Sequence, residues 1–127
     1  MEVTKVIAQG DKLADFITSV KNKLKREHTD CYFYQKDRIT VIAIEQFFFR
    51  VSSNLLTFLV FNETEESQCD IVIISGGGSF GSFGITWGSE NRANKNLIEL
   101  LEETGVKDDI KLQFVFNANV KTNKPGR

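Results

Sequence analysis

The stretch that decides the fold is residues 39–75, which read ITVIAIEQFFFRVSSNLLTFLVFNETEESQCDIVIIS. Apolar residues do not recur here at the 3.6-residue period of a helix, and aromatic and β-branched residues dominate, so we expect strands. Turn-forming residues divide the stretch into strands at 39–49, 55–62 and 69–75. The short links between these strands imply antiparallel neighbours, and therefore a meander.

Helical periodicity appears on both sides of this stretch. After Asp11, one apolar stripe predicts an amphipathic helix, formed by Leu13, Phe16, Ile17, Val20 and Leu24. A second helix is predicted from Ser89 or Glu90 to about Thr104, with Ser89 as its N-cap and Gly105 as its C-terminal cap. Its buried stripe would comprise Ala93, Leu97, Leu100 and Leu101.

Further strands are predicted at residues 3–8, 31–35 and 110–116, the last at a sheet edge. The order is then strand, helix, four-stranded meander, helix, strand. An antiparallel sheet of about five or six strands with two helices on one face is an α+β fold. We expect a single domain over residues 1–116 and a flexible C-terminal tail over 117–127.

The strands carry apolar side chains on both faces of the predicted sheet, whereas a sheet with one wet face should alternate apolar and polar residues. Within 39–49, the residues Ile42, Ile44 and Phe48 point opposite to Ile39, Val41, Ala43 and Phe47; within 55–62, Leu55, Leu59 and Phe61 point opposite to Leu56, Phe58 and Val60; within 69–75, Ile71 and Ile73 point opposite to Val72 and Ile74. Two amphipathic helices can cover only one of these faces. The second face must be covered by another copy of the chain, by an apolar ligand in a cavity, or by the last strand together with the aromatic loop.

That aromatic loop belongs to a glycine-rich segment, residues 74–91, ISGGGSFGSFGITWGSEN. It matches G-x-G-x-x-G, but a dinucleotide site needs a helix that begins at the third glycine, and Gly81 is too far from the predicted helix. It also matches the kinase glycine loop and G-x-S-x-G, but the other kinase segments are missing and the single histidine, His28, lies upstream. We expect a turn whose glycines provide positive φ angles or close backbone approach; a ligand-facing lid is the alternative.

The strand that leads into ISGGGSFGSFGITWGSE, this segment itself and the amphipathic helix after it together resemble a family of small uncharacterised bacterial proteins, known as a domain of unknown function. The resemblance extends from the first helix to Leu101, and its most specific part is GITWGSE. It implies no catalytic residues. The element order also resembles the TATA-box-binding-protein-like and helix-grip layouts, in which a curved sheet embraces helices; this likeness concerns the fold alone.

Composition excludes several functional classes. The net charge is −1, so neither nucleic acid nor anionic membrane is an expected partner. The N-terminus lacks the features of a secretory signal, and no apolar run is long enough to span a bilayer. Cys31 and Cys69 are predicted to be buried thiols in the cytoplasm, and the chain offers too few soft ligands for zinc. We expect no metal and no cofactor.

We therefore predict a non-enzymatic binding or assembly protein that buries an apolar sheet face in a homodimer or against a partner; a carrier or sensor of a small apolar ligand is the alternative. An enzymatic function would depend on Glu45 and Glu90. Glu45 shares a strand face with apolar residues, so it is either the polar anchor of a pocket, facing Arg38 or Arg50, or simply exposed. The residues predicted for a ligand or interface site are Glu45, Phe48, Phe58, Val60, Phe80, Phe83, Trp87 and Glu90.

Overall fold

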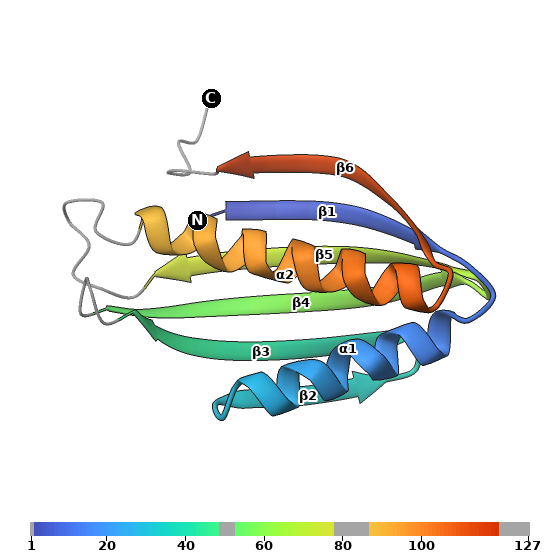
Figure 1. Ribbon diagram of the computed structural model, residues 1–127, viewed down its shortest axis with the longest axis horizontal. Helices are drawn as coiled ribbons and strands as arrows, with labels where there is room; N and C mark the ends of the chain where they lie inside the picture. The colour runs from blue at the N-terminus through green and yellow to red at the C-terminus, as the bar shows by residue number, and fades with distance from the viewer. Residues whose placement is uncertain (1, 49–52, 78–86, 120–127) are drawn as a thin grey trace.

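The computed structural model of this protein describes residues 2–48, 53–77 and 87–119 (Figure 1). At positions 48, 53, 77, 87–94 and 116–119 it describes the backbone only. The elements in chain order are β1 (Glu2–Gln9), α1 (Leu13–Glu27), β2 (Cys31–Lys36), β3 (Ile39–Phe48), β4 (Ser53–Glu65), β5 (Gln68–Gly77), α2 (Trp87–Lys107) and β6 (Lys111–Asn119). This order confirms the predicted α+β class, with the meander between the two helices.

All six strands belong to one sheet in the order β2-β3-β4-β5-β1-β6, and every neighbouring pair is antiparallel. β6 pairs with β1 and forms an edge of the sheet, as predicted. The prediction that this last strand folds over the second face is wrong, because its backbone hydrogen-bonds to β1 within the sheet; residues 78–86 of the aromatic loop, the other part of that prediction, lie outside the described residues. β6 also runs three residues past its predicted end, and Asn119 pairs with Glu2. Residues 120–127 of the predicted tail lie outside the described residues.

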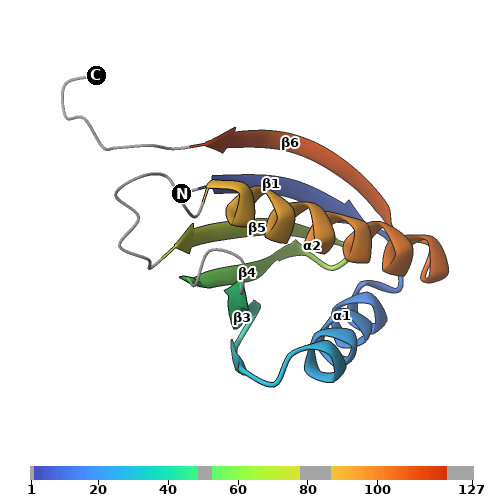
Figure 2. The same ribbon diagram turned by 60° about the vertical axis from the view of Figure 1, so that its left-hand side comes forward.

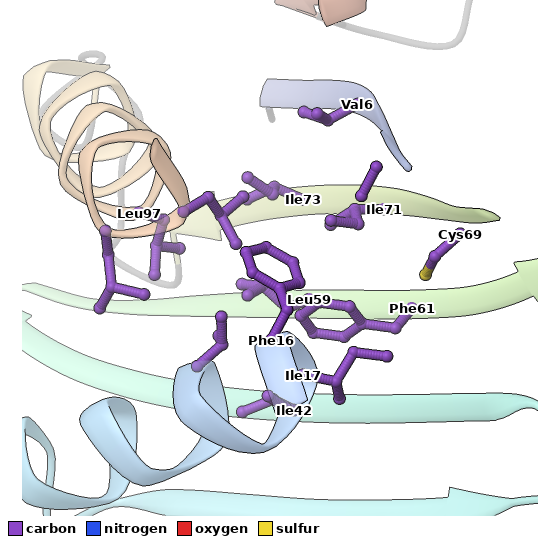
Figure 3. Close-up of a cluster of buried hydrophobic side chains, with 14 of the residues drawn as sticks. Val6, Phe16, Ile17, Ile42, Leu59, Phe61, Cys69, Ile71, Ile73 and Leu97 are labelled. Atoms are coloured by element: carbon purple, nitrogen blue, oxygen red, sulfur yellow. The ribbon is translucent and has the colours of Figure 1, made fainter. Parts of the chain in front are cut away.

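Both helices lie on the same side of the sheet, which curves around them (Figures 1 and 2). The stripe of α1 predicted from the sequence is buried at all five positions, and Leu97, Leu100 and Leu101 of α2 are buried as well. Phe16 of α1 meets Leu59 and Phe61 of β4 in the centre of the core (Figure 3). The helix-side residues of β3, β4 and β5 complete it: Ile42, Ile44, Leu55, Leu59, Phe61, Cys69, Ile71 and Ile73.

The C-terminal end of α2 differs from the prediction. The helix begins at Trp87, before the expected N-cap Ser89, and Gly105 lies inside its last turns. The left-handed residue after the helix is Asp109, with φ of 56°. The Ile110 N–H donates to the Gly105 carbonyl at 2.8 Å and the Asp109 N–H donates to the Val106 carbonyl at 3.4 Å. This is the Schellman pattern, with an aspartate where glycine is usual.

The acidic connection after β4 is shorter than predicted. Residues 63–65 continue β4, and β5 begins at Gln68, so only Glu66 and Ser67 form the turn. An irregularity between Glu63 and Glu65 allows this extension, because it takes one extra residue into the ladder. Gly76 also differs from expectation. It lies in β5 opposite Leu56, and a Cβ placed on it would have no neighbour within 4 Å, so neither close approach nor a positive φ requires glycine there.

Gly10, between β1 and α1, does require glycine. A Cβ at this position would lie 2.6 Å from Ile110 Cδ1 and 2.9 Å from the Asp109 carbonyl oxygen. Gly10→Ala is therefore expected to lower the free energy of unfolding by about 1–3 kcal/mol, because the backbone carbonyl cannot move aside freely. Urea denaturation at fixed protein concentration measures this. Gly76→Ala is the matched control and should change stability by less than about 1 kcal/mol; equal effects of the two substitutions would contradict the explanation.

Candidate protein interface on the open face of the sheet

The open face is the face of the sheet that is turned away from α1 and α2. Strand register places its side chains in rows that run across the strands. Two adjacent rows are mostly apolar, and we call them together the apolar band. One row contains Tyr34, Val41, Val60, Val72 and Lys5, and the other contains Tyr32, Ala43, Phe58, Ile74 and Val3. The prediction that both sheet faces carry apolar side chains is therefore confirmed.

Several large apolar side chains of the open face are in contact with solvent. The exposed fraction is 66% for Tyr32, 59% for Phe47 and 48% for Tyr34, and Leu56 and Ile39 are also exposed. Among residues 2–48, 53–77 and 87–119, no helix or strand lies over this face (Figure 2). Soluble monomers rarely leave a contiguous apolar patch of more than a few hundred Å² bare, so this face has the character of an interaction surface.

The structure distributes the eight predicted site residues over different regions. Phe58 and Val60 lie in the apolar band, and Glu45 lies one row beyond it, exposed to solvent. Phe48 is the last residue of β3, opposite Ser53. Trp87 and Glu90 belong to the first turn of α2, which covers the other face of the sheet. Phe80 and Phe83 lie outside the described residues.

Tyr32 and Tyr34 contribute strongly to the open face, but the predicted site did not include them. The signal that could have identified them is the alternation in CYFYQK, residues 31–36. Cys31 and Phe33 pack against the core, so the two tyrosines between and after them must point to the opposite face. The edge strand β2, with these two outward-facing aromatic residues, extends the apolar band to the β2 edge of the sheet.

Two hollows border the apolar band at opposite ends of β3. One of about 380 Å³ is lined by Asp30, Tyr32, Ala43 and Glu45 among others. The other, of about 560 Å³, lies at the β2–β3 turn and includes Tyr34, Lys36 and Ile39. Small Ala43 between larger neighbours explains the first hollow. The open face therefore offers both protruding aromatic side chains and recesses, which is the relief that shape-complementary interfaces use.

Glu45 lies on the open face next to Asp30. Its backbone N–H donates to the Asp30 carbonyl at 3.1 Å, which continues the row of register pairs one residue beyond β2. Glu45 does not face Arg38, because Arg38 belongs to the β2–β3 turn at the opposite end of β3; Arg50 lies outside the described residues. The side chain is exposed in the single chain. Glu45 is therefore a solvated carboxylate at the border of the apolar band.

A third hollow lies on the helix side, between the C-terminal end of α1 and the middle of α2. Its volume is about 310 Å³, and its walls carry Lys23, Arg26, Glu99 and Glu103, with Gln46 of β3 also in the lining. Such a charged lining does not suit a small apolar ligand. In the part of the chain that the structure describes, no group of three His, Cys, Asp or Glu side chains is placed to hold a metal ion. His28 is the C-terminal cap residue of α1, and its backbone N–H donates to the Leu24 carbonyl.

The two cysteines differ in their environments. Cys69 is fully buried, and burial, with a further contribution from Glu63, raises the pKa of its thiol to about 12. Cys31 is half-buried; burial raises the pKa of this thiol too, while the nearby Lys25 ammonium opposes the shift. Cys69 is thus a buried thiol as predicted, and Cys31 is only partly so. A thiolate is the reactive form, so Cys69 should be inert in the folded protein.

This difference predicts a selective reaction. In the native protein at pH 8, an alkylating reagent should modify Cys31 and leave Cys69 unmodified until the chain unfolds, as mass spectrometry can measure. Because the Cys69 thiol ionises more easily in the unfolded chain, its contribution to stability is complete below its ordinary pKa of 9.0 and is lost as the pH rises toward 12. Equal rates of modification at both cysteines in the native state would contradict the burial of Cys69.

No protein-family model matches the sequence, and no curated protein matches it. In the described part of the chain, neither helix is both long enough and apolar enough to span a membrane.

Proposed function

We propose that this protein is a non-enzymatic assembly module that forms a homodimer by burying the open faces of two sheets against each other. The observation that supports this proposal is the apolar band, in which exposed Tyr32, Tyr34 and Phe58 accompany half-buried valines and isoleucine. Tyrosine and phenylalanine are enriched in protein interfaces, because each covers a large area with few rotatable bonds. Charged side chains within the band are limited to Lys5, at its β1 end, 3.8 Å from Asp70.

The size of the open face fits a dimer. Five strands about 4.8 Å apart span about 24 Å, and four rows about 6.8 Å apart span about 27 Å, which gives about 650 Å² in projection. A standard protein–protein interface buries about 800 Å² on each partner, and side-chain relief adds to the projected area. If the whole apolar band were apolar and exposed, about 330 Å² on each copy would correspond to at most about 16 kcal/mol at 25 cal/mol per Å². This upper bound is of the same order as the cost of association, about 4–15 kcal/mol.

The carrier alternative has less support. The space between the helices and the sheet is filled by the core side chains of Phe16, Leu59 and Phe61 (Figure 3), and the hollow described on the helix side is charged. The free thiols Cys31 and Cys69 are consistent with a reducing compartment, and we propose the cytoplasm.

The molar mass of the wild-type protein in solution tests the proposal. The chain has a mass of 14.4 kDa, so light scattering at micromolar concentration should give about twice that value. Native mass spectrometry of the same sample identifies the occupant: two chains and nothing else supports the homodimer. A single chain at all concentrations would contradict it, and a single chain carrying a small molecule would favour the carrier.

A further inference from the structure

Building on the homodimer proposed above, we infer that its two-fold axis lies between the two sheets and crosses the strands, midway between the two rows of the apolar band. This axis reverses the strand ends, so that each row of one copy lies over the other row of its partner copy. In a two-fold interface the same patch of both copies meets itself. Each large or charged side chain of the patch therefore needs a smaller side chain or an opposite charge elsewhere in the same patch.

The side chains of the two rows provide this match. Across the axis Val41 faces Ala43, Val60 faces Phe58 and Val72 faces Ile74, so that a larger side chain meets a smaller one at the first two of these positions. The strands of both copies remain roughly aligned, as in sheets that pack at about −30°. Tyr32, the most exposed residue of the band, would lie over Tyr34 and beside the larger hollow of the partner copy. The exposed Tyr32 thereby meets the rim of a recess on the partner copy.

Charge supports the same axis. The row beyond one side of the band begins with the acidic residues Asp30 and Glu45, and the row beyond the other side begins with Lys36 and Ile39. Reversing the strand ends brings Lys36 of each copy over the acidic pair of the other. A two-fold axis along the strands would instead leave Asp30 and Glu45 opposite Gly76 and the β1 side of the sheet, away from Lys36. Opposite charges that meet at an interface rim set the register of the partners.

Charge reversal tests the axis. At about 50 mM salt, Lys36→Glu and Asp30→Lys should each weaken the dimer roughly tenfold in dissociation constant, because each creates like-charge contacts at two symmetric positions. The double variant Lys36→Glu/Asp30→Lys exchanges the two charges that face each other across the axis and keeps the wild-type net charge, so it should return to within about threefold of the wild-type dissociation constant. Sedimentation equilibrium measures all four proteins. Glu102→Lys, an exposed site on α2, is the control for charge alone and should leave the dimer unchanged.

The outcomes separate this inference from the proposal on which it depends. The axis is supported if the double variant restores the wild-type dissociation constant at about 50 mM salt. At about 0.5 M salt, both the weakening by the single substitutions and this rescue should disappear, because salt screens the charges. A wild-type dimer whose double variant is weaker than either single variant overturns the axis while leaving the homodimer intact. A monomeric wild type overturns both.

Discussion

Replacing Phe61 with alanine is expected to lower the free energy of unfolding by about 3–5 kcal/mol. Phe61 is fully buried on the helix side of β4, and it packs in the cluster that Phe16 and Leu59 share (Figure 3). Truncation removes the transfer free energy of the ring and leaves a cavity between helix and sheet, where secondary structure on both sides resists collapse. Few other single substitutions in this chain should cost as much.

Urea denaturation measures this loss, at a fixed protein concentration because the stability of a dimer depends on concentration. Phe114→Ala is the matched control. Phe114 lies at the edge strand β6 and is 45% exposed, so its truncation should cost less than about 1.5 kcal/mol. Equal losses for the two phenylalanines would contradict the placement of the core between the helices and the centre of the sheet.

Phe58→Glu, on the other face of the same strand, is expected to leave the fold intact and to dissociate the proposed dimer. In the single chain Phe58 is 36% exposed, so the substitution should change the stability of the monomer by about 1 kcal/mol or less. In the dimer, two carboxylates would be buried in the apolar band without partners. The dissociation constant should rise at least about 100-fold, which is a change of about 2.7 kcal/mol.

Val106→Glu is the control for this substitution. Val106 is an apolar residue of α2 with an exposed fraction of 84%, and it lies on the helix side of the molecule. The same gain of a carboxylate there should leave both the molar mass and the circular dichroism spectrum unchanged. If Phe58→Glu retained the mass of the dimer, or if Val106→Glu dissociated it equally, the open face would not be the interface.

The sequence predicted the strands well because the burial of each side chain follows its position in the alternation. Leu55, Leu59 and Phe61 are buried under the helices, and Leu56 and Phe58 between them are exposed. The first helix was equally predictable, since its stripe from Leu13 to Leu24 is buried at every position. In both cases a local period in the sequence is sufficient to assign the buried side.

The end of the second helix was predicted less well, because two residues compete for one role. Glycine is the usual residue at the left-handed position after a helix, so Gly105 was the expected cap. That position is occupied instead by Asp109, and aspartate tolerates a positive φ better than most residues. Gly105 is instead explained by proximity: a Cβ on it would lie 3.2 Å from the Ile110 carbonyl oxygen and 3.5 Å from Leu112 Cδ1. Such a tertiary contact leaves no local signal in the sequence.

Strand order was also beyond the sequence. The periodicity of residues 110–116 is compatible with a strand at either edge or with a strand lying across the open face. Pairing with β1 decides the matter, because it satisfies the backbone groups of the β1 outer edge from Glu2 to Gln9. In the described part of the chain the open face consequently stays bare of helices and strands, which leaves it accessible to the second copy that we propose.

Isotope-filtered NMR on a mixture of labelled and unlabelled chains tests most directly whether that face is buried between two copies. Methyl groups of Val60, Val72 and Ile74 should show contacts to protons of the other chain, and methyl groups of the core residues Ile17 and Val20 should show none. Contacts between chains that arise only from the helix side, or methyl groups of the apolar band that contact nothing but water, would contradict the account.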